Sequence, residues 1–355
     1  MKRNGATSSG RQRWRCRECG TSTTNKYDPK PSELKSFIDW LLSRDRQCDL
    51  DGSARTFRRR TAQFWKLWPI LPVCDEVHHV VYMDGLWIGR GCVLLIACTD
   101  EYVIGCHLAR SENSKDWGYL MSRIAAPDVL VCDGGGAIEA ARRAKWPKTR
   151  VQRCTFHAFC QVKRCTTSRP KLQAGVELYG IVKVLLHVGD SGGAAEWLAS
   201  FSNWCTRWDE FLKERTIVDG RGQYKHERLR KARRGLEKLC RDRTLFTYLD
   251  GELAKKGDVP ATSNKIESNN ARIRDVLRNH RGLVVDRRIK AGFWWCYMNS
   301  EAPLPYPEML STMPTDGKIM EWRRKAAGGG EKEDVARWGA GIVWSEFHAS
   351  TPFRR

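Results

Sequence analysis

The chain has 355 residues, enough for two or three domains with a sizeable core. A hydrophobic content of 41% with 29% charged residues excludes a largely disordered protein, and no apolar run is long enough to span a membrane. The 62 Lys and Arg against 41 Asp and Glu give a formal net charge of +21, which favours a polyanionic partner over a membrane surface. We expect the 14 cysteines to be reduced thiols, because they are scattered and no secretory leader precedes them.

Residues 1–25 form a short basic arm around the sequence Arg15-Cys16-Arg17-Glu18-Cys19-Gly20. Cys16 and Cys19 have the spacing of a zinc knuckle, because Gly20 permits the tight turn that directs both thiolates at one ion. A structural zinc needs four ligands, and no second pair of cysteines lies nearby in this segment. The segment is therefore either a partial zinc ribbon that binds Zn²⁺ or a basic arm with two free thiols.

Residues 26–72 are typical of a helix-turn-helix DNA-binding domain. We expect a first helix from a Ser32 cap to Arg44, and a second from Ala54 to Trp65 after a Ser53 cap. The second helix should bury Phe57, Thr61, Phe64 and Trp68 and expose the candidate DNA-binding residues Arg55, Arg58, Arg59, Gln63 and Lys66. Residues 1–70 hold 16 Lys and Arg and 7 Asp and Glu, a net of +9, which favours DNA contact over a merely solvated basic helix.

Residues 73–164 alternate strand-like runs with turns. Three runs in close succession, 77–83, 91–98 and 101–108, predict an antiparallel meander. We then expect a helix over 114–124, a buried strand over 129–132, a helix over 137–144 and a short strand over 150–154. This order is the outline of the first part of an α/β ribonuclease-H-like catalytic domain.

Residues 165–260 are rich in Trp, Leu, Lys and Arg and predict an all-helical insertion. Trp197, Phe201, Trp204 and Trp208 have helical spacing, which is typical of packing residues. The core should resume over residues 261–300 with a final helix that buries Ile266, Ile273 and Leu277. Glu267, Asn270, Arg274 and Arg278 would share an adjoining face of that helix, with the two arginines available to DNA. Residues 301–355 predict an irregular tail with one helix near 331–338.

Three carboxylates stand out by their local sequence. Asp84 follows the apolar run 80–83, and Asp133 follows the run 129–132 and begins Asp-Gly-Gly-Gly. Glu267 lies in the first turn of the predicted final helix. Carboxylates at two buried strand ends and on one helix can gather around Mg²⁺ or Mn²⁺. The alternatives are turn-forming Asp-Gly pairs and a Glu that complements a helix dipole.

The ordered set of motifs resembles the bacterial insertion-sequence transposases related to Mutator-like (MULE) elements. The matching stretches are Met83-Asp84-Gly85, Cys132 to Gly136, Cys154-Thr155-Phe156-His157 and Ser263 to Ser268, within a resemblance that covers roughly residues 10–300. It implies an Asp84-Asp133-Glu267 triad that holds two Mg²⁺ or Mn²⁺ ions and catalyses cleavage and strand transfer at inverted-repeat ends. It further implies double-stranded DNA as partner, a homodimer, no membrane, and a bacterial cytoplasmic, nucleoid-associated location.

Cys154 and His157 match a Cys-x-x-His motif of that family. From the residues alone they are either metal ligands, together with Cys160 or Cys165, or a packed thiol and a hydrogen-bonded imidazole. Two other functions remain as alternatives: a non-catalytic sequence-specific DNA-binding relic of a transposase, and a ribonuclease-H-type nuclease acting on RNA–DNA hybrids. A glycan hydrolase also uses paired carboxylates, but the cationic front end gives no reason to prefer it.

Overall fold

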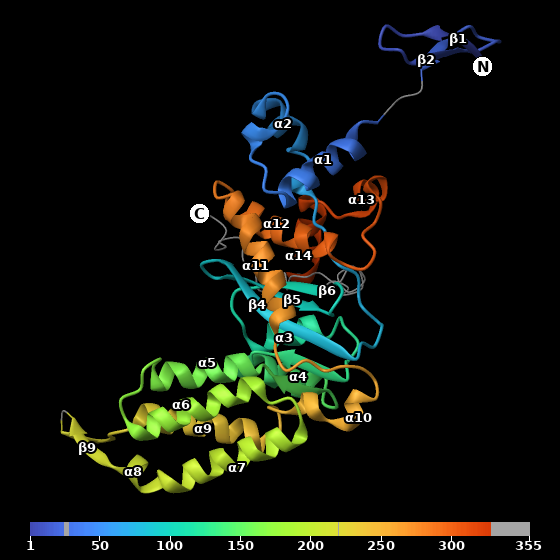
Figure 1. Ribbon diagram of the computed structural model, residues 1–355. Helices are drawn as coiled ribbons and strands as arrows, with labels where there is room; N and C mark the ends of the chain where they lie inside the picture. Colours follow the sequence, from blue (N-terminus) through green and yellow to red (C-terminus); the bar gives the residue numbers. More distant parts are fainter. Residues whose placement is uncertain (25–27, 219, 328–355) are drawn as a thin grey trace. The chain divides into compact units, whose positions relative to one another are not determined.

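The protein is described by a computed structural model over residues 1–24, 28–218 and 220–327 (Figure 1). It is a mixed α/β protein, with a five-stranded mixed sheet and fourteen α-helices in that part of the chain. The chain divides into two compact units, one of residues 1–67 with 304–313 and the other of the remainder. The helix expected near 331–338 lies outside the described residues.

The first unit contains a small sheet and several helices. Its antiparallel strands are β1 (Lys2–Ala6), β2 (Gln12–Arg15) and β3 (Ser22–Thr24). Its helices are α1 (Lys30–Leu42), the 3₁₀ turn η1 (Gln47–Asp49), α2 (Ala54–Thr61), the 3₁₀ turn η2 (Phe64–Lys66) and α13 (Tyr306–Thr312). Phe37 of α1 packs edge-on against Trp65 at 4.9 Å, and Trp40 packs against Phe57 at 5.2 Å between ring centroids.

The helix boundaries of this unit differ in part from those expected. Ser53 does cap α2, because its side chain accepts a hydrogen bond from the Arg55 backbone. Ser32 is not a cap, since α1 begins at Lys30 after Pro29. The second helix stops at Thr61, and a 3₁₀ turn completes the segment that was expected to be helical. Residues 43–53 connect α1 to α2, which is longer than the turn of a typical helix-turn-helix.

The second unit is built on the five-stranded sheet, in the order β6-β5-β4-β7-β8. The strands are β4 (Val80–Gly89), β5 (Cys92–Cys98), β6 (Val103–Ala109), β7 (Val129–Cys132) and β8 (Arg150–Arg153). β4, β5 and β6 form the expected antiparallel meander, whereas β7 and β8 run parallel to β4.

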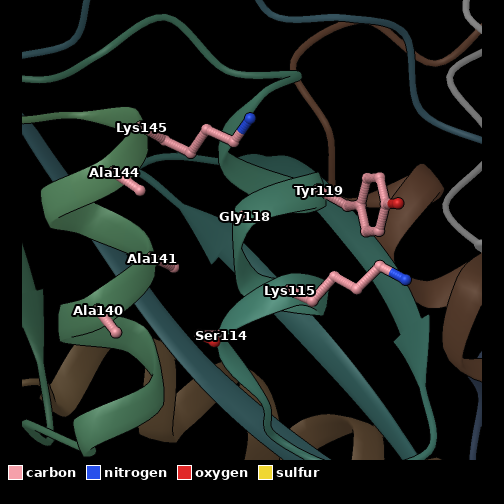
Figure 2. Close-up of a pocket in the computed structure, with 8 residues that line it drawn as sticks. All are labelled: Ser114, Lys115, Gly118, Tyr119, Ala140, Ala141, Ala144 and Lys145. Carbon is pink, nitrogen blue, oxygen red and sulfur yellow. The ribbon is translucent and has the colours of Figure 1, made fainter.

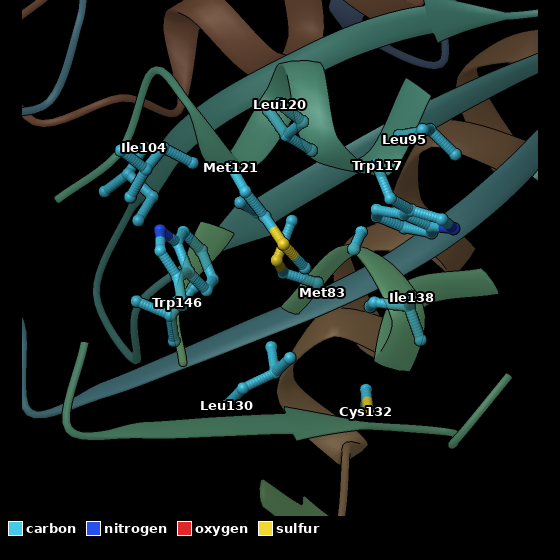
Figure 3. Packing of buried hydrophobic residues seen from close by; sticks show 14 of the residues in the cluster. Met83, Leu95, Ile104, Trp117, Leu120, Met121, Leu130, Cys132, Ile138 and Trp146 are labelled. Carbon is cyan, nitrogen blue, oxygen red and sulfur yellow. The ribbon is translucent and has the colours of Figure 1, made fainter. Parts of the chain in front are cut away.

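Helices cover both faces of this sheet. α3 (Ser114–Met121) and α4 (Gly136–Lys145) pack on one face, where Trp117, Leu120 and Ile138 meet Met83, Leu95 and Leu130 (Figure 3). α11 (Asn264–Asn279) and α12 (Val285–Met298) contact β4 and its neighbours on the other face. Because successive side chains of a strand alternate between faces, Val81 and Met83 point to α3 and α4, and Asp84 belongs to the α11 side.

Between β8 and α11 the chain forms a largely helical region with its own apolar core. Its helices are α5 (Thr155–Thr166), α6 (Gln173–Val184), the 3₁₀ turn η3 (Leu185–His187), α7 (Ser191–Arg207), α8 (Asp209–Lys213), α9 (Glu227–Arg241), the 3₁₀ turn η4 (Thr247–Leu249) and α10 (Gly251–Ala254). Trp197, Phe201 and Trp204 are buried on α7, as their spacing predicted, whereas Trp208 is the C-cap of that helix and is only half-buried. The region is not all-helical, because β9 (Arg215–Val218) and β10 (Arg221–Tyr224) form an antiparallel hairpin.

The segment after residue 300 is more regular than expected. It contains α13 and α14 (Asp316–Ala327), where an irregular tail was predicted. Asp316 explains part of this order, since it accepts hydrogen bonds from the Trp68 indole at 2.7 Å and from the buried Lys290 ammonium at 2.5 Å. None of the described helices is long and apolar enough to cross a membrane.

Candidate acidic site

Asp84 lies in the middle of a strand, not at its end as the sequence suggested. β4 continues to Gly89, and Asp84 pairs with Ile96 of β5. The Asp-Gly pair therefore forms no turn here. The signal that would have shown this is the continued alternation after Gly85, because Leu86 and Ile88 are buried while Trp87 is exposed.

The register of the parallel strands places Asp133 abreast of Asp84. β4 and β7 pair at Val80–Val129 and Tyr82–Val131, an offset of 49 residues (131 − 82 = 49). The same offset separates Asp84 from Asp133 (133 − 84 = 49), and β7 ends one residue before Asp133. Neighbouring strands lie about 4.8 Å apart, so the two carboxylates start from adjacent positions where the strands part.

The surroundings of Asp84 disfavour its charge. Burial and the Asp133 charge raise the pKa of Asp84 to about 6, from an ordinary value of 3.8. The Asn270 amide of α11 donates a hydrogen bond to its Oδ2 at 2.7 Å. Asn270 is itself fully buried, whereas Arg274 and Arg278 are exposed further along the same helix. Its own Oδ1 is buried without a hydrogen-bond partner among the described residues.

Glu267 lies in the first turn of α11 and is held by two neighbours. The Ser263 hydroxyl donates a hydrogen bond to its Oε1 at 2.6 Å, and the His157 Nδ1 lies 3.5 Å from the same oxygen. Ser263 is buried, whereas the side chains of His157 and Glu267 are 29% and 37% exposed. One carboxylate oxygen of Glu267 is thereby engaged by the protein.

His157 connects the three carboxylates electrostatically. Its hydrogen bond with Cys154 raises the pKa of the imidazole, and the charges of Glu267 and Asp133 raise it further. The same imidazole lowers the pKa of Asp84 against the larger effects of burial and Asp133. Charge interactions thus link the three carboxylates with His157, although 183 residues separate Asp84 from Glu267 (267 − 84 = 183). Among the described residues, three ligand atoms within 4.8 Å of one another are found for Cys154, His157 and Glu267, and not for the three carboxylates.

Cys154 is the N-cap of α5 and is buried next to His157 and Glu267. Burial alone raises the pKa of its thiol, but hydrogen bonds with His157 and Ser263 outweigh burial and lower the pKa below the ordinary value. The Ser263 backbone N–H donates to its sulfur at 3.4 Å. The Sγ of Cys154, a ring nitrogen of His157 and a carboxylate oxygen of Glu267 all lie within 4.8 Å of one another. Cys160 and Cys165 are not part of this group.

A fourth carboxylate that the sequence analysis missed is Glu112, in the loop between β6 and α3. The Trp87 indole donates to its Oε1 at 3.1 Å, and burial together with the Asp133 charge raises the pKa of Glu112. A Cβ at Gly85 would lie 2.7 Å from the Glu112 carboxyl carbon. Glu112 can therefore lie against β4 only because residue 85 is a glycine. This contact joins segments that are distant in sequence, so the sequence alone does not predict it.

Gly134 has a similar role beside Asp133. Its φ of +80° is in the left-handed region, and a Cβ there would lie 2.5 Å from the Arg153 side chain. Arg153 is nearly buried at the end of β8. The glycine that follows Asp133 thus permits both the turn of the backbone and the close approach of Arg153.

The candidate DNA-binding residues are all exposed. Arg55, Arg58 and Arg59 project from α2, and Gln63 and Lys66 follow it. Arg274 and Arg278 are exposed on α11, where Arg278 pairs with Asp275 at 2.8 Å.

Cys16 and Cys19 occupy the turn between β2 and β3. The Cys16 N–H donates to the Thr21 carbonyl at 2.9 Å, and Gly20 has a φ of +69°. A hydrogen bond with the Thr21 side chain is the main reason why the pKa of Cys19 falls to about 7. In the described part of the chain no third Cys, His, Asp or Glu joins them, so zinc binding here stays a prediction.

A cavity of about 320 Å³ lies between α3 and α4. Small residues of both helices line it, and Lys115, Tyr119 and Lys145 extend along its rim (Figure 2). It is on the sheet face opposite to Asp84 and contributes no group to the acidic site.

Comparison with known proteins adds no assignment to this geometry. No family model matches the chain, and no curated protein is significantly similar to it.

Proposed function

We propose that the protein is a DNA transposase of the Asp-Asp-Glu type, with Asp84, Asp133 and Glu267 as its catalytic carboxylates. The observation that carries the proposal is the register of β4 with β7, which sets Asp84 and Asp133 at adjacent positions. The charge interactions of Asp133 and Glu267 with His157 support a common site with the start of α11. A three-stranded meander followed by two parallel strands, with helices on both faces, supports a ribonuclease-H-like catalytic domain. The long region between β8 and α11 supports a transposase over a plain ribonuclease-H-type nuclease, which has no use for it.

The donor set fits Mg²⁺ or Mn²⁺. The three proposed ligands offer only oxygen, which these ions prefer. Burial and the charge of Asp133 raise the pKa of Asp84, and a bound divalent cation would favour the charged carboxylate. Asn270, which donates a hydrogen bond to Asp84, has a buried Oδ1 without a hydrogen-bond partner among the described residues. When bound, a pair of divalent ions would neutralise the phosphodiester oxygens and lower the pKa of the attacking group.

The residues of the chain would prepare the site for that chemistry. Asn270 holds one oxygen of Asp84 by a hydrogen bond, and Ser263 holds one oxygen of Glu267. Fixed ligands lose little conformational freedom when an ion binds. His157 would balance the excess negative charge of the cluster.

The substrate proposed is double-stranded DNA. The net charge of +21 and the exposed basic side chains of α2 suit a phosphate backbone. Joining two ends of one element requires two copies of the catalytic site, so we expect at least a homodimer on DNA. Zinc at Cys16 and Cys19 would belong to the same DNA-binding front end.

The test is a cleavage and strand-transfer assay on a plasmid that carries the coding region with its flanking DNA. We expect Mg²⁺-dependent nicking and joining by the wild type, and a loss of at least a thousandfold for Asp84→Ala, Asp133→Ala and Glu267→Ala. Glu210→Ala is the matched control, because its side chain is 87% exposed on α8 and far from the site in sequence. DNA binding measured in parallel should be retained by all four variants.

Three results would overturn the proposal. Full activity of Asp84→Ala would remove the triad from the chemistry. Binding to the flanking DNA without any metal-dependent cleavage would favour the DNA-binding relic. Cleavage of an RNA–DNA hybrid without strand transfer would favour the nuclease.

A further inference from the structure

The Cys-x-x-His motif of Cys154 and His157 forms a second group of metal-ligand atoms together with Glu267. This group shares Glu267 with the acidic site but differs from it in its sulfur and nitrogen ligands. Cys154, His157 and Glu267 offer one sulfur, one nitrogen and one oxygen within 4.8 Å of one another. Sulfur and imidazole ligands are poor partners for Mg²⁺ but suit Zn²⁺. Three protein ligands with an open fourth position are the usual composition of a zinc site that exchanges water or substrate.

The distances within the group are close to those of a tetrahedral site. Bonds of about 2.0–2.1 Å to nitrogen and oxygen place two ligand atoms roughly 3.3–3.4 Å apart around Zn²⁺. The His157 Nδ1 and the Glu267 Oε1 are 3.5 Å apart. The Ser263 backbone N–H donates to the Cys154 sulfur at 3.4 Å, a hydrogen bond that suits the thiolate which metal binding requires.

The local backbone favours negatively charged ligands at this place. Cys154 caps α5 and His157 lies in its first turn, while Glu267 lies in the first turn of α11. Both helix N-termini carry partial positive charge, which stabilises a thiolate and a carboxylate. The side chains of His157 and Glu267 are partly exposed, whereas Cys154 is buried.

We propose that Cys154, His157 and Glu267 bind one Zn²⁺ ion, separate from the Mg²⁺ pair of the acidic site. The ion would join the two ends of the helical region, because Cys154 and His157 lie where the chain enters it and Glu267 where the chain returns. A backbone hydrogen bond already joins these ends, from the Thr155 N–H to the Ala261 carbonyl at 3.0 Å. Glu267 has two carboxylate oxygens, so one can face the zinc while the other serves the acidic site.

The test uses Co²⁺ as a spectroscopic substitute for Zn²⁺ in the full-length chain. Cys16→Ser/Cys19→Ser serves as the parent, which removes the other pair of closely spaced thiols. We expect one equivalent of Co²⁺ to produce the near-ultraviolet thiolate-to-metal absorption in the parent. Adding Cys154→Ser should abolish that absorption, whereas adding Cys160→Ser on the same helix should leave it unchanged.

Two further variants keep the test decisive. His157→Gln alters a partly exposed side chain that a stable fold should tolerate, and it should weaken Co²⁺ binding at least tenfold. Asp84→Asn should lose Mg²⁺-dependent cleavage but retain the cobalt absorption, which separates failure of this proposal from failure of the transposase proposal. Absence of the absorption in the parent, its survival in Cys154→Ser, or unchanged affinity in His157→Gln would overturn the zinc site.

Discussion

Asp84 shows how a folded chain can hold a carboxylate in the middle of a buried strand. Burying a charge is costly, and here a neighbouring carboxylate adds to the cost. The Asn270 hydrogen bond compensates for part of it. Carboxylates with a pKa perturbed in this way cluster at functional sites.

The pH dependence of stability should reveal this cost. Because the pKa of Asp84 is raised from 3.8 to about 6, the folded state holds this proton more tightly than the unfolded state. Protonation of Asp84 therefore stabilises the folded state fully below about pH 4, and this stabilisation is lost as the pH rises through 6. Without divalent metal, the unfolding free energy of the wild type should therefore fall relative to Asp84→Asn by about 2–3 kcal/mol between pH 4 and pH 7. Urea unfolding at several pH values measures this, and a constant difference would contradict it.

A glycine follows each of the two candidate catalytic aspartates, Asp84 and Asp133. Gly85 admits Glu112 above β4, and Gly134 admits Arg153 beside Asp133. The Asp-Gly pairs were open to interpretation as turns. In the structure their glycines leave space for neighbouring side chains next to each carboxylate, and for Gly134 the positive φ adds a backbone reason.

At the scale of elements, α2 is a short helix with an unusually cationic exposed surface. Its inner side packs on α1 through Phe57 and Trp40, so Arg58 and Arg59 are left in solvent. The connection from α1 to α2 is longer than in a typical helix-turn-helix, but the two arginines are exposed because of the packing of α2 on α1. The basic face of α2 is therefore the element on which DNA binding can be tested directly.

Removing this charge should weaken DNA binding in a salt-dependent way. Arg58→Ala/Arg59→Ala should lower the affinity for duplex DNA about tenfold or more near 0.1 M salt. The slope of the logarithm of the binding constant against the logarithm of salt concentration should become shallower by about 0.9 for each phosphate that is no longer neutralised. Fluorescence anisotropy at several salt concentrations provides the measurement. Lys35→Ala is the control, because it removes an exposed charge that pairs with Asp39 on α1. Equal slopes for the wild type and the double variant would exclude α2 as a phosphate-binding element.

At the scale of the whole molecule, the acidic site joins parts of the chain that are distant in sequence. β4, the end of β7 and the start of α11 each contribute one carboxylate. An ion bound to all three would stabilise the folded state alone, because the unfolded chain offers no such arrangement. Divalent metal should therefore act on global stability, which a purely structural set of carboxylates would not produce.

Thermal unfolding with and without Mg²⁺ tests this linkage. A concentration of 100 times the dissociation constant adds about 2.7 kcal/mol, which should raise Tm by roughly 5–10 °C in a unit of this size. Asp84→Asn and Asp133→Asn should each lose most of the shift, whereas Glu210→Ala should retain it. A shift of equal size in Asp133→Asn would show that Mg²⁺ binds elsewhere.

Much of the fold could be predicted from the sequence because its signals are local. The continuous apolar runs of β5 and β7 and the helical spacing of Trp197, Phe201 and Trp204 indicate burial wherever the chain folds. The errors arose where a local signal was ambiguous. Asp84-Gly85 resembles a turn, residues 215–224 form a hairpin within a basic helical region, and α14 is ordered partly by the contacts of Asp316 with Trp68 and Lys290.

The sequence by itself determined the three candidate carboxylates, since each stands in a recognisable local frame at or near an apolar strand or a helix start. Only the tertiary structure decided what surrounds them. Asn270 beneath Asp84, Glu112 above Gly85 and Cys154 beside Glu267 are contacts between segments that no local pattern relates. Strand alternation and helix periodicity act over a few residues, whereas the register of β4 with β7 and the packing of α5 against the start of α11 depend on the whole core.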